Sequence, residues 1–506
     1  MQKRQTLINA VMSSLQVILV SGVLFFLYKF LLNTIGVEKL GIWSLILATT
    51  SVTQVANLGL SGSVVKFVAK YAALNEYDNV SRVIQTTVIS LGLIIGIVLL
   101  AGYPLIKWIL GFVVPANSLS LALNILPYAL FSLWLNTIAG IFQSGIDGFQ
   151  KIYIRNSLMI CGSIFFALLC TIFAPKYGLI GLAYAQIINN TGILITSWIL
   201  IKRILPVLPI IPCAWNKTIF KEIINYGINF QIISISTMLY DPITKALLSK
   251  FGGLSMVGYY EMANKVIQQV RALIVSANQV LVPAIADLNE KSPEKIKIVY
   301  MKSYRLLFYL TIPLFTLLIV FIPNISKIWI GYYEKTFIIF GILLTIGWLL
   351  NIFAGPAYFA NLGTGKLRYN VVSHIIIGLL NAGLGFLLGM FYGGIGVIIG
   401  WVISLSIGSS IIYISYHIIE DIPLKELFPS ESKRLFLSCM LFVLIITIIQ
   451  TMLFNRVNIV ISSLALLFLF LIIVFYPFWH HPMRRQITGL ISNELINKSA
   501  DLKVKI

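Results

Sequence analysis

Long apolar runs recur along the whole chain, and they constrain its fold more than any other feature of the sequence. These runs alternate with short polar loops from residue 11 to residue 479. A helix of about 20 apolar residues crosses a bilayer and satisfies its own backbone hydrogen bonds there. Hydrophobic residues make up 58% of the chain, and charged residues make up only 11%, against about a quarter in soluble domains. The sequence therefore predicts an all-α polytopic membrane protein.

The apolar runs predict about fourteen transmembrane helices. The predicted spans are 11–33, 41–65, 83–104, 119–143, 156–174, 179–201, 223–248, 257–284, 303–323, 337–360, 371–391, 394–418, 435–454 and 458–479. Lys and Arg residues gather in the loops on the side that holds both termini. Cytoplasmic loops keep basic residues, so we expect both termini in the cytoplasm. The net charge of +20 is thus interpreted as membrane topology, and no nucleic-acid partner is expected.

An internal repeat divides the spans into two sets of six. Gly36 and Gly41 are echoed by Gly253 and Gly258 at an offset of 217 positions. The sequence YGLIG at 177–181 is echoed by YGGIG at 392–396 at an offset of 215. Because six is an even number, the second set enters the membrane in the same direction as the first, which predicts parallel repeats.

The repeat defines the predicted domain organisation. An N-lobe of six helices covers 1–204, an inter-lobe linker covers 205–221, and a C-lobe of six helices covers 222–419. Two extra helices follow at 420–479, and a cytoplasmic tail covers 480–506. The Trp215–Ile224 segment of the linker either lies on the inner membrane surface as an amphipathic helix or is simply ordered chain.

The eighth predicted span is both long enough to cross a membrane and strongly polar on one side. On a helical projection Glu261, Lys265, Gln268, Arg271 and Asn278 share one half of the helix. The other half is apolar and contains Met262, Ala263, Val266, Val270, Leu273, Ile274 and Ala277. A charged side chain that faces lipid is costly, so we expect the polar half to line a hydrated cavity or a protein contact.

Further polar and charged residues lie in the first, second and seventh spans. Lys29 is in the first span, Asn57 is in the second, and Lys66 ends the second. In the seventh span Asp241 and Lys245 are one helical turn apart and can pair, as can Glu261 and Lys265 in the eighth. These carboxylates either form such ion pairs or bind Na⁺ or H⁺. The basic residues outnumber the acidic ones, and a positive cavity attracts anions such as phosphates.

Catalytic motifs are absent from the sequence. The segment LGTGK at 362–366 lacks the residues of a phosphate-binding loop at both Ala360 and Leu367. His374 and His417 stand alone on apolar segments, without the spacing of a metal site. We therefore expect no catalytic residues, no metal and no cofactor, and we do not expect an enzyme.

Two segments resemble a known family. The sequence ANLGLSGSVVKFVAKYAALNEYD at 56–78 resembles the second-span signature of bacterial O-antigen-type polysaccharide flippases. The sequence GLSMVGYYEMANKV at 253–266 resembles the matching signature of the second lobe. GIDGFQK and LGTGKLR resemble the turns after the fourth and tenth spans. These flippases form the polysaccharide transport branch of the multidrug/oligosaccharidyl-lipid/polysaccharide (MOP) exporter superfamily.

The resemblance implies a MATE-like pair of six-helix lobes with a central cavity between helices 1, 2, 7 and 8. It further implies alternating access that moves an undecaprenyl-pyrophosphate-linked oligosaccharide from the inner to the outer leaflet of the bacterial cytoplasmic membrane. The cavity cations that match the family pattern are Lys29, Lys66, Lys245, Lys265 and Arg271. Asn57, Gln268 and Asn278 complete the set of expected substrate-binding residues. The expected partners are the lipid-linked glycan and membrane lipids, and the candidates beyond these are the polymerase or glycosyltransferases of the same pathway and Na⁺ or H⁺.

Two other functions compete with this interpretation. An ion-coupled drug or metabolite antiporter of the same fold would favour an acidic and aromatic pocket, and the basic excess argues against it. A membrane-embedded glycan polymerase or ligase would carry a large external loop with catalytic residues, whereas the predicted external loops are short.

Overall fold

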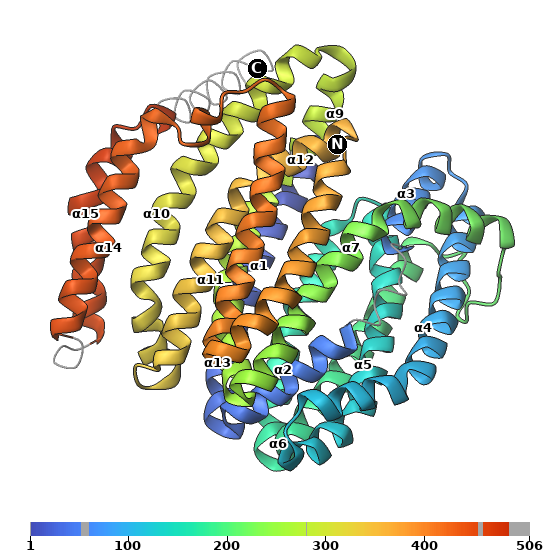
Figure 1. Cartoon of the computed structure of the whole chain (residues 1–506). Coiled ribbons are helices and arrows are strands. Elements are labelled where there is room, and N and C mark those ends of the chain that lie inside the picture. Colours follow the sequence, from blue (N-terminus) through green and yellow to red (C-terminus); the bar gives the residue numbers. More distant parts are fainter. Residues whose placement is uncertain (1, 52–59, 280, 454–458, 485–506) are drawn as a thin grey trace, which may run out of the picture. The chain divides into compact units, whose positions relative to one another are not determined.

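The computed structural model describes residues 2–51, 60–279, 281–453 and 459–484. Every regular element in these ranges is a helix (Figure 1). The long helices are α1 (Gln2–Ile35), α2 (Val37–Ser51), α3 (Leu60–Ala73), α4 (Tyr77–Val113), α5 (Ala116–Gly148), α6 (Ile152–Ile204), α7 (Lys217–Gly252), α8 (Leu254–Gln279), α9 (Leu281–Lys291), α10 (Ile296–Ile330), α11 (Lys335–Phe353), α12 (Gly355–Thr364), α13 (Arg368–Ile419), α14 (Lys433–Leu453) and α15 (Ile459–Trp479). Short 3₁₀ helices cover Pro293–Lys295, Leu424–Leu427 and Ser430–Ser432.

The chain forms two compact units. One contains the residues up to Leu273 together with His374–Ser404, and the other contains Ile274–Ser373 together with the residues from Leu405 onward. The predicted boundaries of the lobes (1–204 and 222–419), linker (205–221), extra helices (420–479) and tail (480–506) stay predictions.

Nine helices within the described ranges are long and apolar enough to cross a membrane. Two of them hold two predicted spans each, because α6 and α13 run through kinks at Gly178 and Gly393. The three most polar predicted spans, at 41–65, 223–248 and 257–284, are not among the nine. The all-helical multi-pass membrane fold is confirmed, and the number of fourteen spans stays a prediction.

Glycines with positive φ angles recur in the two halves at the offsets of 217 and 215 positions seen in the sequence. Gly36 and Gly253 have positive φ angles of 82° and 81° at the junctions before α2 and α8. Gly178 and Gly393 have φ angles of 57° and 60° at the kinks of α6 and α13. A positive φ favours glycine, because a Cβ atom is strained there. The glycine pattern therefore marks equivalent turns in the two halves.

Helices α2 and α8 cross with their backbones in contact. A Cβ atom added at Gly41 would lie 2.0 Å from the carbonyl oxygen of Leu254, and one added at Gly258 would lie 2.4 Å from that of Val37. Positions 37 and 254 differ by the same 217 residues as positions 41 and 258. The crossing is therefore reciprocal, and each repeat supplies the same glycine to it.

A second packing motif occurs once in each unit. Gly148 of α5 lies against α3, where an added Cβ atom would be 2.6 Å from Val68 Cβ. Gly363 of α12 lies against α9, where an added Cβ atom would be 2.9 Å from Ile285 Cγ2. Val68 and Ile285 are again 217 positions apart. In both halves a glycine thus allows close packing of the equivalent neighbouring helix, α3 in one and α9 in the other.

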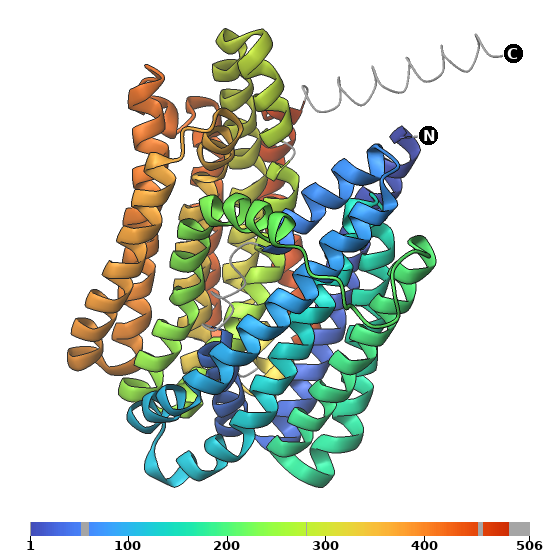
Figure 2. The ribbon, with the colours of Figure 1, turned by 90° about the vertical axis from the view of Figure 1, so that its right-hand side faces the viewer.

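The connection between α6 and α7 is anchored along α4 (Figure 2). The backbone N–H groups of Cys213 and Ala214 donate to Gln85 Oε1 at 3.1 and 3.0 Å. The indole of Trp215 donates to Ser90 Oγ at 3.0 Å. Helix α7 begins at Lys217, and Asn216 caps it by accepting from Thr218 and Ile219. Residues 205–216 are therefore ordered chain, and residues 217–224 of the predicted amphipathic segment form the first two turns of α7. Whether these turns lie on the inner membrane surface stays a prediction.

In the other unit, α14 and α15 pack on α10. The ring of Tyr309 on α10 stacks on Phe478 at 4.5 Å and on His481 at 4.6 Å between ring centroids. Asn324 Nδ2 donates to Ser463 Oγ at 2.8 Å. The two additional C-terminal helices predicted from the sequence thus pack against α10.

Candidate functional site

Four charged side chains meet where α7 and α8 lie side by side. Lys245 Nζ on α7 lies 2.5 Å from Asp241 Oδ2 one turn earlier and 2.7 Å from Glu261 Oε2 on α8. Lys265 Nζ lies 3.4 Å from Glu261 Oε1, again one turn away. We call Asp241, Lys245, Glu261 and Lys265 the ion-pair network. It is neutral overall, because it holds two ammonium and two carboxylate groups.

Burial differs across the ion-pair network. Lys245 and Glu261 are only 5% and 6% exposed, whereas the side chains of Asp241 and Lys265 are 41% and 43% exposed. A charge without a partner in such a buried position costs several kcal/mol. Each of the two buried charges is therefore held by two opposite charges, and the network opens to its surroundings only at its edges.

Hydroxyl groups from α1, α2 and α8 complete the network. Tyr28 donates to Glu261 Oε1 at 2.9 Å, and Ser44 donates to Glu261 Oε2 at 2.8 Å. Tyr260 donates to Asp241 Oδ1 at 3.2 Å. Sequence analysis missed all three. Ser44 could have been found, because it is the repeat equivalent of Glu261, whereas nothing in the sequence indicates Tyr28 or Tyr260.

Arg271 lies further along α8, six residues after Lys265 and so about 9 Å along the helix axis. Its Nη1 donates to Gln268 Oε1 at 3.4 Å, and Gln268 Nε2 donates to Asn264 Oδ1 at 3.5 Å. The three side chains form a polar ladder on one face of α8, which agrees with the predicted polar half. Arg271 is half-buried, and its charge is not part of the ion-pair network.

Three of the remaining predicted site residues lie elsewhere in the described part of the chain. Lys29 on α1 and Lys66 on α3 are exposed, and the Lys66 ammonium lies 5.7 Å from the centroid of the Phe67 ring. Asn278 donates to the backbone oxygen of Ile274 at 2.9 Å, within its own helix. Asn57 lies outside the described residues. The structure thus assembles four of the ten predicted residues, with Arg271 and Gln268 beside them on α8.

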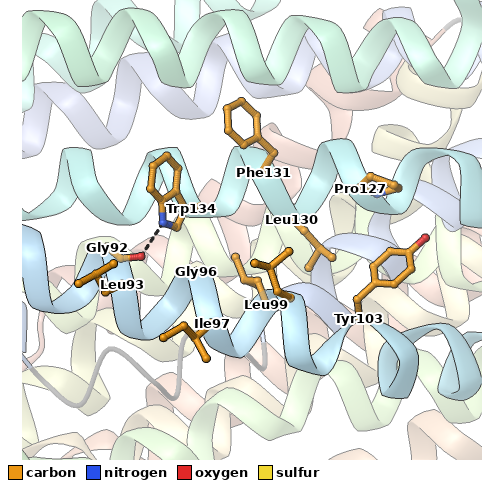
Figure 3. Close-up of a pocket in the computed structure, with 11 residues that line it drawn as sticks. Gly92, Leu93, Gly96, Ile97, Leu99, Tyr103, Pro127, Leu130, Phe131 and Trp134 are labelled. Carbon is orange, nitrogen blue, oxygen red and sulfur yellow. Dashed lines mark hydrogen bonds between the residues drawn. The ribbon is translucent and has the colours of Figure 1, made fainter.

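A separate apolar groove of about 630 Å³ runs between α4 and α5 (Figure 3). Its lining includes Leu93, Ile97, Leu100 and Phe131. The one indole N–H in it belongs to Trp134 and donates to the carbonyl oxygen of Gly92 at 2.8 Å. This groove offers hydrocarbon surface and is distinct from the ion-pair network.

Comparison with known proteins connects this arrangement to a family. The chain matches the family model of polysaccharide biosynthesis proteins over residues 18–333, which is more than half of its length. The chain belongs to the polysaccharide biosynthesis protein family. The resemblance noted from residues 56–78 and 253–266 is therefore confirmed.

This polysaccharide biosynthesis protein is also similar to a curated relative and to solved transporters. It is 22% identical over 383 residues to a "Putative O-antigen transporter" of Shigella flexneri, covering 74% of this chain and 88% of the relative. Its fold matches lipid II flippase MurJ in an inward closed conformation with a TM-score of 0.71 and 14% identity, covering 97% of this chain and all of MurJ. An inward-facing multidrug resistance MATE transporter of the MOP superfamily gives a TM-score of 0.67 and 16% identity, with 80% and 94% coverage. These likenesses show a MATE-like and MurJ-like fold.

Proposed function

We propose that this chain is a flippase that moves an undecaprenyl-pyrophosphate-linked oligosaccharide from the inner to the outer leaflet by alternating access. The observation that carries the proposal is the family match over residues 18–333. The MurJ-like fold over nearly the whole chain supports it, because the solved neighbour is a flippase for a lipid-linked substrate. The relative described as an O-antigen transporter supports a polysaccharide repeat unit as the cargo.

Lys265 and Arg271 are our proposed pyrophosphate-binding residues. Both lie on the polar half of α8, and the Lys265 side chain is 43% exposed. An Arg guanidinium can hold two phosphate oxygens at once, while a Lys ammonium acts as a point charge. Gln268 contacts Arg271 and would orient its guanidinium. Two cations about 9 Å apart along the helix suit a doubly charged and extended headgroup.

Lys245 has a different role in this proposal. Its ammonium lies within 2.7 Å of two carboxylates, so its charge is already compensated. We therefore assign it to holding α7 on α8 rather than to the substrate. The substrate-binding roles of Lys29, Lys66, Asn57 and Asn278 remain sequence predictions.

Alternating access also needs a contact that can open. We propose the crossing of α2 and α8 as that contact, since Gly41 and Gly258 bring the two backbones together there. Tyr28 and Ser44 hold α1 and α2 to the same carboxylate of α8. Opening the crossing would separate α1 and α2 from α8. Closing it would restore the hydrogen bonds from Tyr28 and Ser44 to Glu261.

The proposed location is the bacterial inner membrane with both termini in the cytoplasm, as the distribution of basic residues predicts. The function is tested by reconstituting the purified chain in vesicles that carry a labelled undecaprenyl-pyrophosphate glycan. We expect the labelled glycan to become accessible to a membrane-impermeant reagent over time, faster than in protein-free vesicles. Equal rates in both preparations would contradict the proposal.

The alternative is an ion-coupled small-molecule antiporter, which the MATE-like fold favours. The same vesicles distinguish the two functions. An antiporter would move a cationic dye when a Na⁺ or H⁺ gradient is imposed and would leave the glycan in its original leaflet.

A further inference from the structure

The ammonium of Lys245 lies between two carboxylates that three hydroxyl groups also contact. Asp241 and Glu261 contact it directly at 2.5 and 2.7 Å. Because both of these oxygens contact one nitrogen atom, they lie no more than about 5 Å apart. Tyr28, Ser44 and Tyr260 donate to the same two carboxylates. We call this arrangement, without the ammonium, the oxygen cage.

The oxygen cage has the composition of a site for a hard inorganic cation. Hard cations prefer carboxylate, carbonyl and water oxygens, and Ca²⁺ takes them at about 2.3–2.6 Å. Two carboxylate oxygens that are at most about 5 Å apart can both contact a small ion placed between them. Ser44 donates to Glu261 Oε2, the same oxygen that contacts the ammonium, and its hydroxyl oxygen carries lone pairs that can turn toward such an ion.

The charges of the ion-pair network favour a cation at this position. With Lys245 in place, two ammonium groups balance two carboxylates. Without it, Glu261, which is 6% exposed in the wild-type chain, would keep only Lys265, whose ammonium is 3.4 Å away at the exposed edge. A buried carboxylate that loses its partner either binds another cation or takes up a proton.

We propose that Lys245 is a built-in cation of the oxygen cage, and that replacing it with alanine creates a binding site for one monovalent cation such as Na⁺. In the wild-type protein the tethered ammonium excludes a free ion from this position. Asp241, with a side chain that is 41% exposed, gives a small ion a route to the vacated space. This inference concerns the cage alone and does not depend on the proposed flippase function.

The test measures equilibrium binding of radioactive Na⁺ to the purified full chain at constant ionic strength, with choline as the replacement cation. Wild-type protein is expected to show no saturable Na⁺ binding at this position. Glu261→Gln should therefore leave the Na⁺ binding of the otherwise wild-type protein unchanged. Lys245→Ala is expected to bind about one Na⁺ per chain, and its melting temperature should rise with Na⁺ concentration, because a ligand that binds only the folded state stabilises it. The double variant Lys245→Ala/Glu261→Gln should lose both effects.

Lys265→Ala is the matched control. It removes one ammonium from the same network but leaves Lys245 in the oxygen cage, so it should gain no Na⁺ binding. Equal binding by Lys265→Ala and Lys245→Ala would show that net charge alone is responsible and would overturn the proposal. A Lys245→Ala protein that folds and binds no Na⁺, but whose melting temperature depends on pH, would also overturn the proposal. A proton would then replace the ammonium.

The variant is also prepared in parallel in NaCl and in choline chloride, in case it does not fold without a cation. Recovery of folded protein only in NaCl supports the proposal. Failure to recover folded protein in either salt contradicts it, because Na⁺ would then be unable to replace the ammonium.

Discussion

Ser44 and Glu261 occupy equivalent positions in the two repeats and are hydrogen-bonded to each other. Ser44 Oγ donates to Glu261 Oε2 at 2.8 Å across 217 positions of the chain. Ser255 Oγ and Glu38 Oε1 have the same relation at 3.4 Å. Each repeat thus contributes one serine and one glutamate to the contact of α2 with α8. The serine of each repeat bonds to the glutamate of the other. The buried one of the two pairs belongs to the ion-pair network.

The backbone contact at the α2–α8 crossing predicts that Gly41→Ala is destabilising. Its Cβ atom would meet the carbonyl oxygen of Leu254, and relieving such a clash costs about 1–3 kcal/mol. We expect a lower melting temperature in detergent than for the wild type. Gly140→Ala is the control, because an added Cβ atom there meets nothing within 4 Å. A Gly41→Ala protein as stable as Gly140→Ala would show that the crossing is not tight.

The buried ion pair predicts a large effect of Glu261→Ala on the free energy of unfolding. The substitution leaves the 5%-exposed Lys245 with one carboxylate, and breaking such a pair costs about 3–5 kcal/mol. Denaturant unfolding measures this cost. Asp287→Ala breaks the exposed pair with Lys291, one helical turn away, where about 0–1 kcal/mol is expected. Similar losses in the two variants would contradict the burial of the network.

The hydrogen bonds of Gln85 predict that this side chain keeps the α6–α7 connection in place. Gln85 is buried and accepts from two backbone N–H groups of the connection. In Gln85→Ala each orphaned donor costs about 1–3 kcal/mol unless it reaches water. We expect faster hydrogen exchange at Cys213 and Ala214, measured by mass spectrometry. Arg82→Ala on the exposed side of α4 should leave these exchange rates unchanged.

Much of this could be predicted from the sequence, for identifiable reasons. The apolar runs determine the class of fold, and glycines at constant offsets reveal the repeat, because glycine is required at turns and close crossings. The pairs Asp241/Lys245 and Glu261/Lys265 follow from helical spacing. The contact of Lys245 with Glu261 does not, since it depends on how α7 folds back along α8. The predicted role of these cations in binding an anion stays a prediction.

Burial of His481, which follows the last membrane helix, predicts a pH effect on stability. Its ring lies against Tyr309 and bonds to Ser432 at 3.0 Å, and burial lowers the pKa of the imidazole below the usual value of 6.5. The unfolded chain therefore binds the proton more readily. The stability contribution is complete above pH 6.5 and is lost as the pH falls from there toward the folded-state pKa.

His481→Gln should therefore lose less stability than the wild type between pH 8 and pH 5, as measured by melting temperature. His480→Gln is the control, because the neighbouring His480 is exposed, and it should follow the wild-type curve. A wild-type curve that coincides with that of His481→Gln would contradict the effect.

The central claim is that cations on the polar half of α8 hold the pyrophosphate of a lipid-linked glycan. The most direct measurement is glycan delivery in vesicles by Arg271→Ala and Lys265→Ala, with Lys107→Ala as a control that removes an exposed charge from α4. We expect Arg271→Ala and Lys265→Ala to slow delivery at least about tenfold, a change of about 1.4 kcal/mol, when equal amounts of folded protein are compared. Lys107→Ala should deliver at the wild-type rate. Undiminished delivery by both α8 variants would contradict the assignment of the pyrophosphate site.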